Sequence, residues 1–216
     1  MRIVKEINRE IIETLKAGGV IVYPTETCYG IGGDATNPEV VEKIYKIKQR
    51  REEKPFLVVV PDVEMAMEYL EWNDKIDEIA SKYWPGAVTI VGKMQNAKCK
   101  MQNGDNILQS EIYNFKLADG VVAPDGTIAL RVTAHPIASA LARGLGGPLI
   151  STSANISGQE PTYSSNAVLK MFENQPDQPD ILIDAGELPK NPPTTIVRVV
   201  GGEVEVLRQG KLEIGN

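Results

Sequence analysis

Apolar residues follow two alternating patterns along the chain. Short continuous runs, such as residues 20–23 and 56–60, predict strands, because a strand buried on both faces needs apolar side chains at successive positions. Between these runs, apolar residues recur every three or four positions and predict helices. The clearest begins at Pro38, and its predicted buried stripe is Val40, Val41, Ile44, Tyr45 and Ile47. Helices and strands that alternate in this way predict an α/β fold.

Capping and turn residues mark the ends of these elements. Asn8 precedes a first helix that ends at Gly18-Gly19, and Thr36 or Asn37 precedes the helix at Pro38. Further helices are expected over residues 62–72, 73–84, 135–146 and 164–172. Further strands are expected over residues 87–91, 127–132, 148–151, 181–183, 195–200 and 204–207. Gly201-Gly202 predicts a tight hairpin between the last two. The expected architecture is one domain, residues 1–216, with a twisted mixed parallel and antiparallel sheet and helices packed around it.

Residues 93–125 do not follow this rhythm. They are rich in Lys, Asn, Gln and Gly, and Lys93-Met94-Gln95-Asn96 recurs as Lys100-Met101-Gln102-Asn103. Two copies are too few for a repeat architecture. We expect a long surface insertion that is either a mobile lid or functionally inert.

Composition narrows the possible settings and partners. Hydrophobic residues make up 42% of the chain, which is enough to form a core. The net charge of −6 argues against broad binding to a phosphate backbone. The two cysteines, Cys28 and Cys99, are far apart, so a disulfide framework or a thiolate metal site is not expected. With no signal peptide or membrane span expected either, the predicted setting is cytoplasmic.

Three polar clusters follow predicted strands or helices. Pro24-Thr25-Glu26-Thr27-Cys28-Tyr29-Gly30 succeeds a strand and offers hydroxyls, a carboxylate and a glycine, as a site for a small polar ligand does. Residues 48–54 hold four cations, which suit either a helix C-terminus or a cradle for a triphosphate. Residues 151–155, Ser-Thr-Ser-Ala-Asn, form either an ordinary turn or a set of donors for a phosphate or oxyanion.

Single residues leave further alternatives. Arg131 interrupts a predicted strand and is expected to face solvent, to pair with a carboxylate or to bind an anion. His135, the one histidine, is expected to cap a helix. No P-loop pattern occurs, and no Ser-His-Asp or Cys-His pair is evident, so Cys28 has no base to activate it. The chemistry should therefore depend on positioning and charge stabilisation.

Taken in order, these clusters resemble the YrdC/Sua5 family of threonylcarbamoyl-AMP synthases. The stretch Pro24 to Gly30 is similar to the family motif P-T-E-T-x-Y-G. The residues Lys48-Gln49-Arg50, followed by Lys54-Pro55, are similar to the family motif K-x-R…K-P. The residues Ser153-Ala154-Asn155 are similar to the family motif S-x-N. The resemblance covers about residues 8–92 and 127–210. It implies a large, positively lined central cavity and the joining of L-threonine, bicarbonate and ATP, with Mg²⁺, into threonylcarbamoyl-AMP and pyrophosphate.

The resemblance also implies roles for individual residues. The ATP phosphates and the carbamate would be held by the tetrad Lys48, Arg50, Ser153 and Asn155, with Thr127 and Arg208 also on the nucleotide side. Threonine would be held by Thr25, Lys54, Arg131, Ser151 and Thr194. The product would pass to a threonylcarbamoyl-transferase complex that modifies adenosine 37 of tRNA, and strong direct binding of tRNA is not expected.

The chain departs from the family pattern at three places. Arg51 stands where the family often has Pro, Thr133 replaces a usual Pro, and Arg198 replaces a usual Asp. These changes lie beside the tetrad and bear on loop shape. Two alternative functions are a carbamoyl-transfer module of the hydrogenase-maturation type and a non-enzymatic RNA-binding module.

Overall fold

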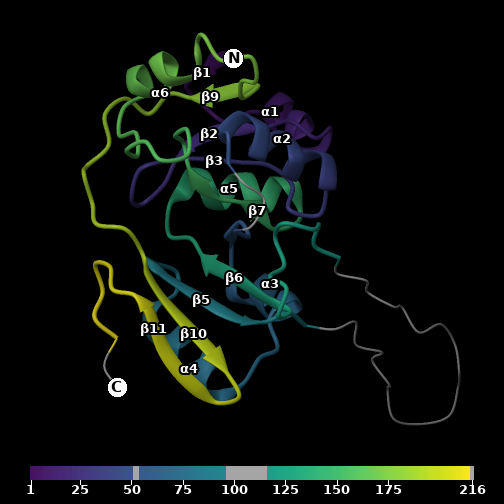
Figure 1. The fold of residues 1–216 in the computed structure, drawn as a ribbon, viewed down its shortest axis with the longest axis vertical. Helices are drawn as coiled ribbons and strands as arrows, with labels where there is room; N and C mark the ends of the chain where they lie inside the picture. Colours follow the sequence, from purple (N-terminus) through teal and green to yellow (C-terminus); the bar gives the residue numbers. More distant parts are fainter. Residues whose placement is uncertain (51–53, 96–115, 215–216) are drawn as a thin grey trace, which may run out of the picture.

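The computed structural model describes residues 1–50, 54–95 and 116–214, which form two mixed sheets with helices around them. Figure 1 shows the sheets in opposite halves of the molecule, with a central helix between them. The mixed α/β class predicted from the sequence is confirmed. The expectation of one sheet is wrong, because the strands divide between two.

The first sheet has five strands in the order β1-β9-β2-β3-β8. Its members are β1 (Arg2–Val4), β2 (Ile21–Pro24), β3 (Tyr29–Gly32), β8 (Thr152–Ser153) and β9 (Ile181–Ile183). β2 and β3 form an antiparallel hairpin whose turn holds the first polar cluster, whereas β9 runs parallel to both β1 and β2. The turn at 25–28 therefore lies at one end of this sheet.

The second sheet has six strands in the order β11-β10-β5-β6-β4-β7. Its members are β4 (Val58–Val60), β5 (Val88–Lys93), β6 (Thr127–Val132), β7 (Leu149–Ile150), β10 (Thr195–Val200) and β11 (Glu203–Arg208). The predicted hairpin between the last two strands is confirmed, with positive φ at both Gly201 and Gly202.

Local capping signals explain where the helices begin. The helices are α1 (Arg9–Lys16), α2 (Pro38–Lys48), α3 (Val63–Tyr69), α4 (Asp74–Tyr83), α5 (Pro136–Leu145) and α6 (Ser165–Phe172). The side chains of Asn8, Asn37, Asp62 and Asn73 each accept a hydrogen bond from a backbone N–H in the first turn that follows. α5 is central, packing against β2 of one sheet and β4 of the other.

The chain crosses between the sheets at Ser151. β7 pairs with β4 in the six-stranded sheet, and two residues later β8 pairs with β3 in the five-stranded sheet. A Cβ built on Gly32 would lie 1.6 Å from the carbonyl oxygen of Ile150, so only glycine lets β3 approach the crossing this closely. The polar cluster at 151–155 is thereby fixed at the junction of the two sheets.

The bounds predicted for the insertion are too wide. β5 continues to Lys93, and Leu117, Ala118 and Val121 are buried in the main core. The rest of the predicted insertion, residues 96–115, lies outside the described residues, as does Arg51. Within the described parts of the chain, no helix has the length and apolar character needed to cross a membrane.

Candidate active site between the two sheets

The β2–β3 turn is organised by the hydroxyl of Thr25. Thr25 is buried, and its Oγ1 donates to the carbonyl oxygen of Cys28 at 2.8 Å. Oγ1 of Thr25 also accepts a hydrogen bond from the backbone N–H of Thr27 at 3.2 Å. The turn is therefore held from within, and its polar groups are fixed where the hairpin ends.

Lys48 is the last residue of α2 and is buried. Its ammonium group donates to the carbonyl oxygen of Ser153, and to the carbonyl oxygen and Oδ1 of Asn155 at 2.8 and 3.2 Å. Burial, together with the positive charge of Arg50, lowers the pKa of Lys48 to about 7. A cation this poorly neutralised by its neighbours favours the arrival of an anion.

Ser153 and Asn155 complete a cluster around this lysine. The hydroxyl of Ser153 donates to Oδ1 of Asn155 at 2.6 Å, and the Asn155 amide in turn donates to the carbonyl oxygen of Gln159. The structure thus brings three of the four tetrad residues into direct contact, although they come from segments about a hundred positions apart.

Arg50 is held beside this cluster by different contacts. Its guanidinium lies 4.8 Å from the centre of the Phe56 ring and donates to the carbonyl oxygen of Lys54 at 2.9 Å. A hollow of about 580 Å³ is bordered by the whole tetrad and by Lys54. The described residues around the hollow therefore include three with basic side chains, three with hydroxyls and two with amides.

Arg131 of β6 is almost fully buried, with 3% of its side chain exposed. Its Nη1 lies 2.6 Å from Oε2 of Glu26, so the pairing with a carboxylate that the sequence left open is present. Burial raises the pKa of Glu26, but the charge of Arg131 and the hydroxyl of Thr133 outweigh it and lower the pKa to about 2. The Glu26 carboxyl group is therefore ionised near neutral pH.

A second cavity, of about 510 Å³, lies between the two sheets. Predicted site residues that line it are Thr25, Arg50, Arg131, Ser151, Ser153, Thr194 and Arg208. Arg208 of β11 donates from Nη2 to Oγ1 and the carbonyl oxygen of Thr194, at 3.0 and 2.9 Å. Arg50 and Ser153 border both hollows, so the two spaces adjoin.

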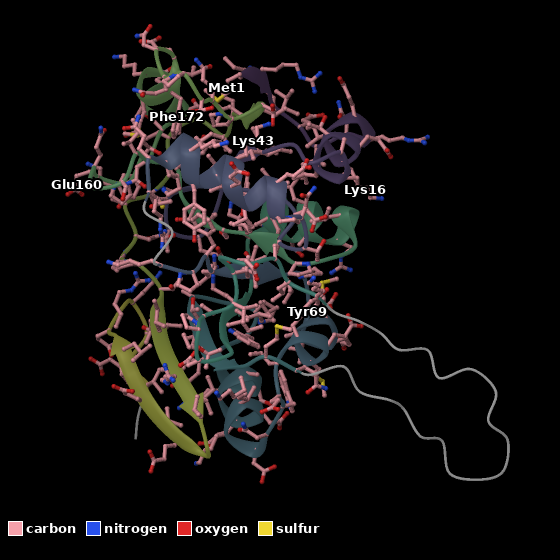
Figure 2. The ribbon with its side chains drawn as sticks, turned by 45° about the vertical axis from the view of Figure 1, so that its right-hand side comes forward. Met1, Lys16, Lys43, Tyr69, Glu160 and Phe172 are labelled. Atoms are coloured by element: carbon pink, nitrogen blue, oxygen red, sulfur yellow. The ribbon has the colours of Figure 1, made fainter. Side chains whose placement is uncertain are left out.

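The lining gives the cavity a positive character. Three arginines line it, and Glu160 is the one carboxylate in the lining formed by the described residues. Glu160 is exposed, and Figure 2 shows its side chain at the margin of the molecule. Such a wall of guanidinium groups and hydroxyls suits a ligand with a carboxylate or a phosphate group.

Thr127 is not brought together with the other site residues. It lines a separate hollow with Asp125, and its hydroxyl donates to the Asp125 carboxylate at 2.7 Å. Its hydroxyl is thus bonded to the turn that precedes β6, and its assignment to the ATP site stays a prediction.

His135 differs from expectation, whereas Cys28 agrees with it. The His135 side chain makes no capping hydrogen bond. Oε1 of Glu26 accepts from the backbone N–H groups of Ala134 and His135, just before α5, at 2.7 and 3.2 Å. Cys28 is buried yet also lines the second cavity. Burial raises the pKa of its thiol, which keeps it protonated at neutral pH.

Sequence reasoning gave Glu26 no function of its own, and it passed over Asn191. The Asn191 amide lines the cavity and donates to the backbone carbonyl oxygen of Glu26 at 2.9 Å. The sequence context could have indicated a function for Glu26, because it is a carboxylate between two threonines in an otherwise uncharged turn. No local pattern marked Asn191, because its partner lies 165 positions away.

Comparison with known proteins identifies a family and several relatives. A family model for Sua5, YciO and YrdC proteins, described as "Telomere recombination", matches residues 13–210. A protein from Idiomarina loihiensis named threonylcarbamoyl-AMP synthase is 33% identical over 190 residues, which are 86% of this chain and 90% of that protein. A Marinobacter nauticus protein of the same name is 34% identical over 193 residues, 88% of this chain and 90% of its own.

A solved structure is similar to this chain in fold. The crystal structure of P. abyssi Sua5 complexed with L-threonine matches with a TM-score of 0.77 and 25% identity over 97% of this chain. The match covers 57% of the P. abyssi protein, so this chain spans little more than half the length of that relative.

Proposed function

The chain belongs to the Sua5, YciO and YrdC family, and on that premise we propose that it is an L-threonylcarbamoyl-AMP synthase. One observation carries the proposal beyond family membership. The hollow bordered by the tetrad and the cavity lined by Arg131 share Arg50 and Ser153, so two different ligands can meet at these residues. An enzyme that joins an amino acid to a nucleotide needs this arrangement.

The proposed reaction has two bond-forming steps. The neutral amine of threonine attacks carbon dioxide, which is in equilibrium with bicarbonate, and loses a proton to give a carbamate. A carbamate oxygen then attacks the α-phosphorus of ATP, and the bond to the β-phosphate oxygen breaks to release pyrophosphate. Negative charge moves onto the pyrophosphate in this step, so fixed cations close to the phosphates lower the barrier.

The described residues divide between the two substrates in this proposal. Threonine lies in the cavity between the sheets, with its carboxylate on Arg131 and its polar groups near Thr25, Ser151 and Thr194. The phosphates of ATP occupy the hollow at Lys48, with Arg50 beside it. Lys54, which the resemblance assigns to threonine, borders this hollow and not the cavity between the sheets, so we assign it to the phosphates instead. Ser153 and Asn155 position the Lys48 ammonium group. Arg208 serves the nucleotide side of the cavity.

Magnesium enters the proposal as part of the nucleotide substrate. Within the described residues, no group of three or more His, Cys, Asp or Glu side chains is placed to hold a metal ion. Mg²⁺ would be carried on the phosphate oxygens of ATP, where it neutralises charge. A threonylcarbamoyl-transferase complex acting on tRNA is the proposed consumer of the product.

The test is pyrophosphate release from ATP and bicarbonate in the presence of each amino acid in turn. Release that depends on threonine and on bicarbonate is the expected result. Release driven by carbamoyl phosphate would favour the carbamoyl-transfer alternative. Salt-sensitive binding of RNA without any release would favour the RNA-binding module.

Substitution of the tetrad cations tests where the phosphates lie. Lys48→Ala and Arg50→Ala should each lower threonine-dependent pyrophosphate release by about a hundredfold or more, because each removes a cation that faces developing charge. Lys46→Ala is the matched control, since Lys46 is exposed on the same helix and pairs with Glu42. Normal turnover in both tetrad variants would contradict the assignment.

A further inference from the structure

Arg131 depends on a second residue for its place in the cavity wall. A guanidinium buried without a partner is costly, and within the described parts of the chain Glu26 is the one carboxylate in ion-pair contact with it. Nε of Arg131 is buried and makes no hydrogen bond. Arg131 therefore keeps donor capacity for a ligand even while it is paired.

The two oxygens of Glu26 have separate tasks. Oε1 accepts three hydrogen bonds, from the Thr133 hydroxyl at 2.7 Å and from the backbone N–H groups of Ala134 and His135, which directly precede α5. Oε2 faces Nη1 of Arg131. Because the start of α5 fixes one oxygen, the other presents a fixed negative charge to the guanidinium.

Glu26 also joins segments that belong to different sheets. Its own turn follows β2 of the five-stranded sheet, whereas Arg131 lies in β6 of the six-stranded sheet. Its backbone carbonyl oxygen accepts from Asn191, in the segment that leads to β10. Arg131, Thr25 and Asn191 line the cavity, while the Glu26 carboxylate is occupied by its protein partners.

We propose that Glu26 is a positioning residue that sets the affinity for the amino acid by holding Arg131 in the geometry that receives the substrate carboxylate. This inference rests on the proposed function, since it deepens the role of the same cavity. Thr133, which departs from the family pattern, supplies one of the three donors that hold Glu26. The affinity for threonine is accordingly set by the whole chain of contacts from α5 to Arg131.

A double-mutant cycle tests the proposal. Glu26→Gln keeps the size of the side chain but removes its charge, and should raise the threonine KM by about tenfold or more while leaving the ATP KM within about threefold. Arg131→Gln should raise the threonine KM further. The double variant should have a threonine KM no higher than that of Arg131→Gln alone, because Glu26 acts through Arg131. Glu42→Gln, which breaks an exposed pair on α2, is the matched control and should leave both KM values unchanged.

A second ligand separates positioning from a general loss of structure. L-Threoninamide has no carboxylate. Glu26→Gln should therefore leave the affinity for L-threoninamide unchanged and lower the affinity for L-threonine, both measured by calorimetry. An equal loss of affinity for both ligands would overturn the proposal. An unchanged threonine KM in Glu26→Gln, or effects on the threonine KM that add in the double variant, would also overturn it. If Glu26→Gln does not fold, Thr133→Val is the test, because it removes one hydrogen bond to Oε1 of Glu26 and keeps the ion pair with Arg131. An increase of about threefold in its threonine KM would support the proposal, and no increase would overturn it.

The same measurements distinguish failure of the inference from failure of the proposed function. A wild-type protein that binds threonine but releases no pyrophosphate would contradict the synthase assignment, and the calorimetric cycle would still test Glu26. Active wild-type protein with additive losses would contradict only the role of Glu26.

Discussion

Lys48 shows how much of a residue's chemistry depends on its surroundings. In the sequence it is one of four cations near the end of a helix, and either solvation or phosphate binding explains it. In the fold it is buried among three oxygen acceptors, none of which carries a full charge. Its lowered pKa follows from that burial and from the nearby charge of Arg50. A phosphate group would supply the missing negative charge.

Binding of ATP should therefore be accompanied by proton uptake. Lys48 has a pKa of about 7 in the free protein, so at pH 8 most molecules hold it neutral. Phosphate oxygens beside the ammonium group favour the charged form and raise the pKa, so a proton is taken up. Calorimetric titrations at pH 8 in buffers of different ionisation enthalpy measure this uptake. It should approach about one proton per ATP and fall as the pH is lowered below 7.

Lys48→Met is the control for this measurement. It should retain weaker binding of ATP or of inorganic pyrophosphate, with the uptake at pH 8 abolished. Equal uptake by Lys48→Met and the wild type would show that another group titrates.

The pairing of Arg131 marks the limit of sequence reasoning at this scale. The alternation of β6 placed the residue correctly in a strand, and it left solvent, a carboxylate or an anion as possible partners. The choice depended on a turn 105 positions away, which only the tertiary structure brings near. Thr127 shows the opposite situation, since its hydroxyl bonds to Asp125, which lies only two positions away in the chain.

At the scale of elements, helices were predictable where a local signal defined them. Asn8, Asn37 and Asp62 all cap helices as their positions implied, because a cap needs only the residues that follow it. β3 was missed because two of its four residues are glycines and its strand character arises from pairing with β2 and β8. Close packing against the crossing at Ser151 requires one of those glycines.

Gly32→Ala should destabilise the protein strongly. The added Cβ would lie 1.6 Å from the carbonyl oxygen of Ile150, and a strand backbone cannot yield as a flexible side chain does. We expect a loss of about 3 kcal/mol or more in the free energy of unfolding, measured with urea. Gly147→Ala is the matched control, because a Cβ added there would meet no other atom within 4 Å, and it should change stability by about 0.5 kcal/mol or less. Similar stability of Gly32→Ala and the wild type would show that β3 does not need this approach.

At the scale of the whole molecule, the two sheets share one core. The largest apolar cluster contains Val22 and Ile31 from the five-stranded sheet and Val58, Ile90 and Leu130 from the six-stranded sheet. α5 packs on both sheets, and the chain passes from one to the other at Ser151. The cavity between them is therefore built on a single packed unit, and its opposite walls keep a fixed separation.

A shared core predicts that the two sheets unfold together. Both tryptophans, Trp72 and Trp84, lie beside the helices that pack near the six-stranded sheet, with ring centres 6.4 Å apart, so their fluorescence reports on that half. Ile31→Ala lies in the other sheet and is fully buried, and should cost about 2–5 kcal/mol. If unfolding is cooperative, its urea midpoint by tryptophan fluorescence should fall together with the midpoint by far-ultraviolet circular dichroism.

Ile3→Ala, an exposed apolar position on β1 of the same sheet, is the control and should shift neither midpoint appreciably. A fluorescence midpoint that stays at the wild-type value in Ile31→Ala while the dichroism midpoint falls would show that the sheets unfold separately. In that case the cavity walls would move independently, and binding of threonine on one side would not fix the residues that hold ATP on the other. Coincident shifts instead imply that either substrate stabilises the whole molecule by mass action, so a saturating ligand should raise both midpoints equally.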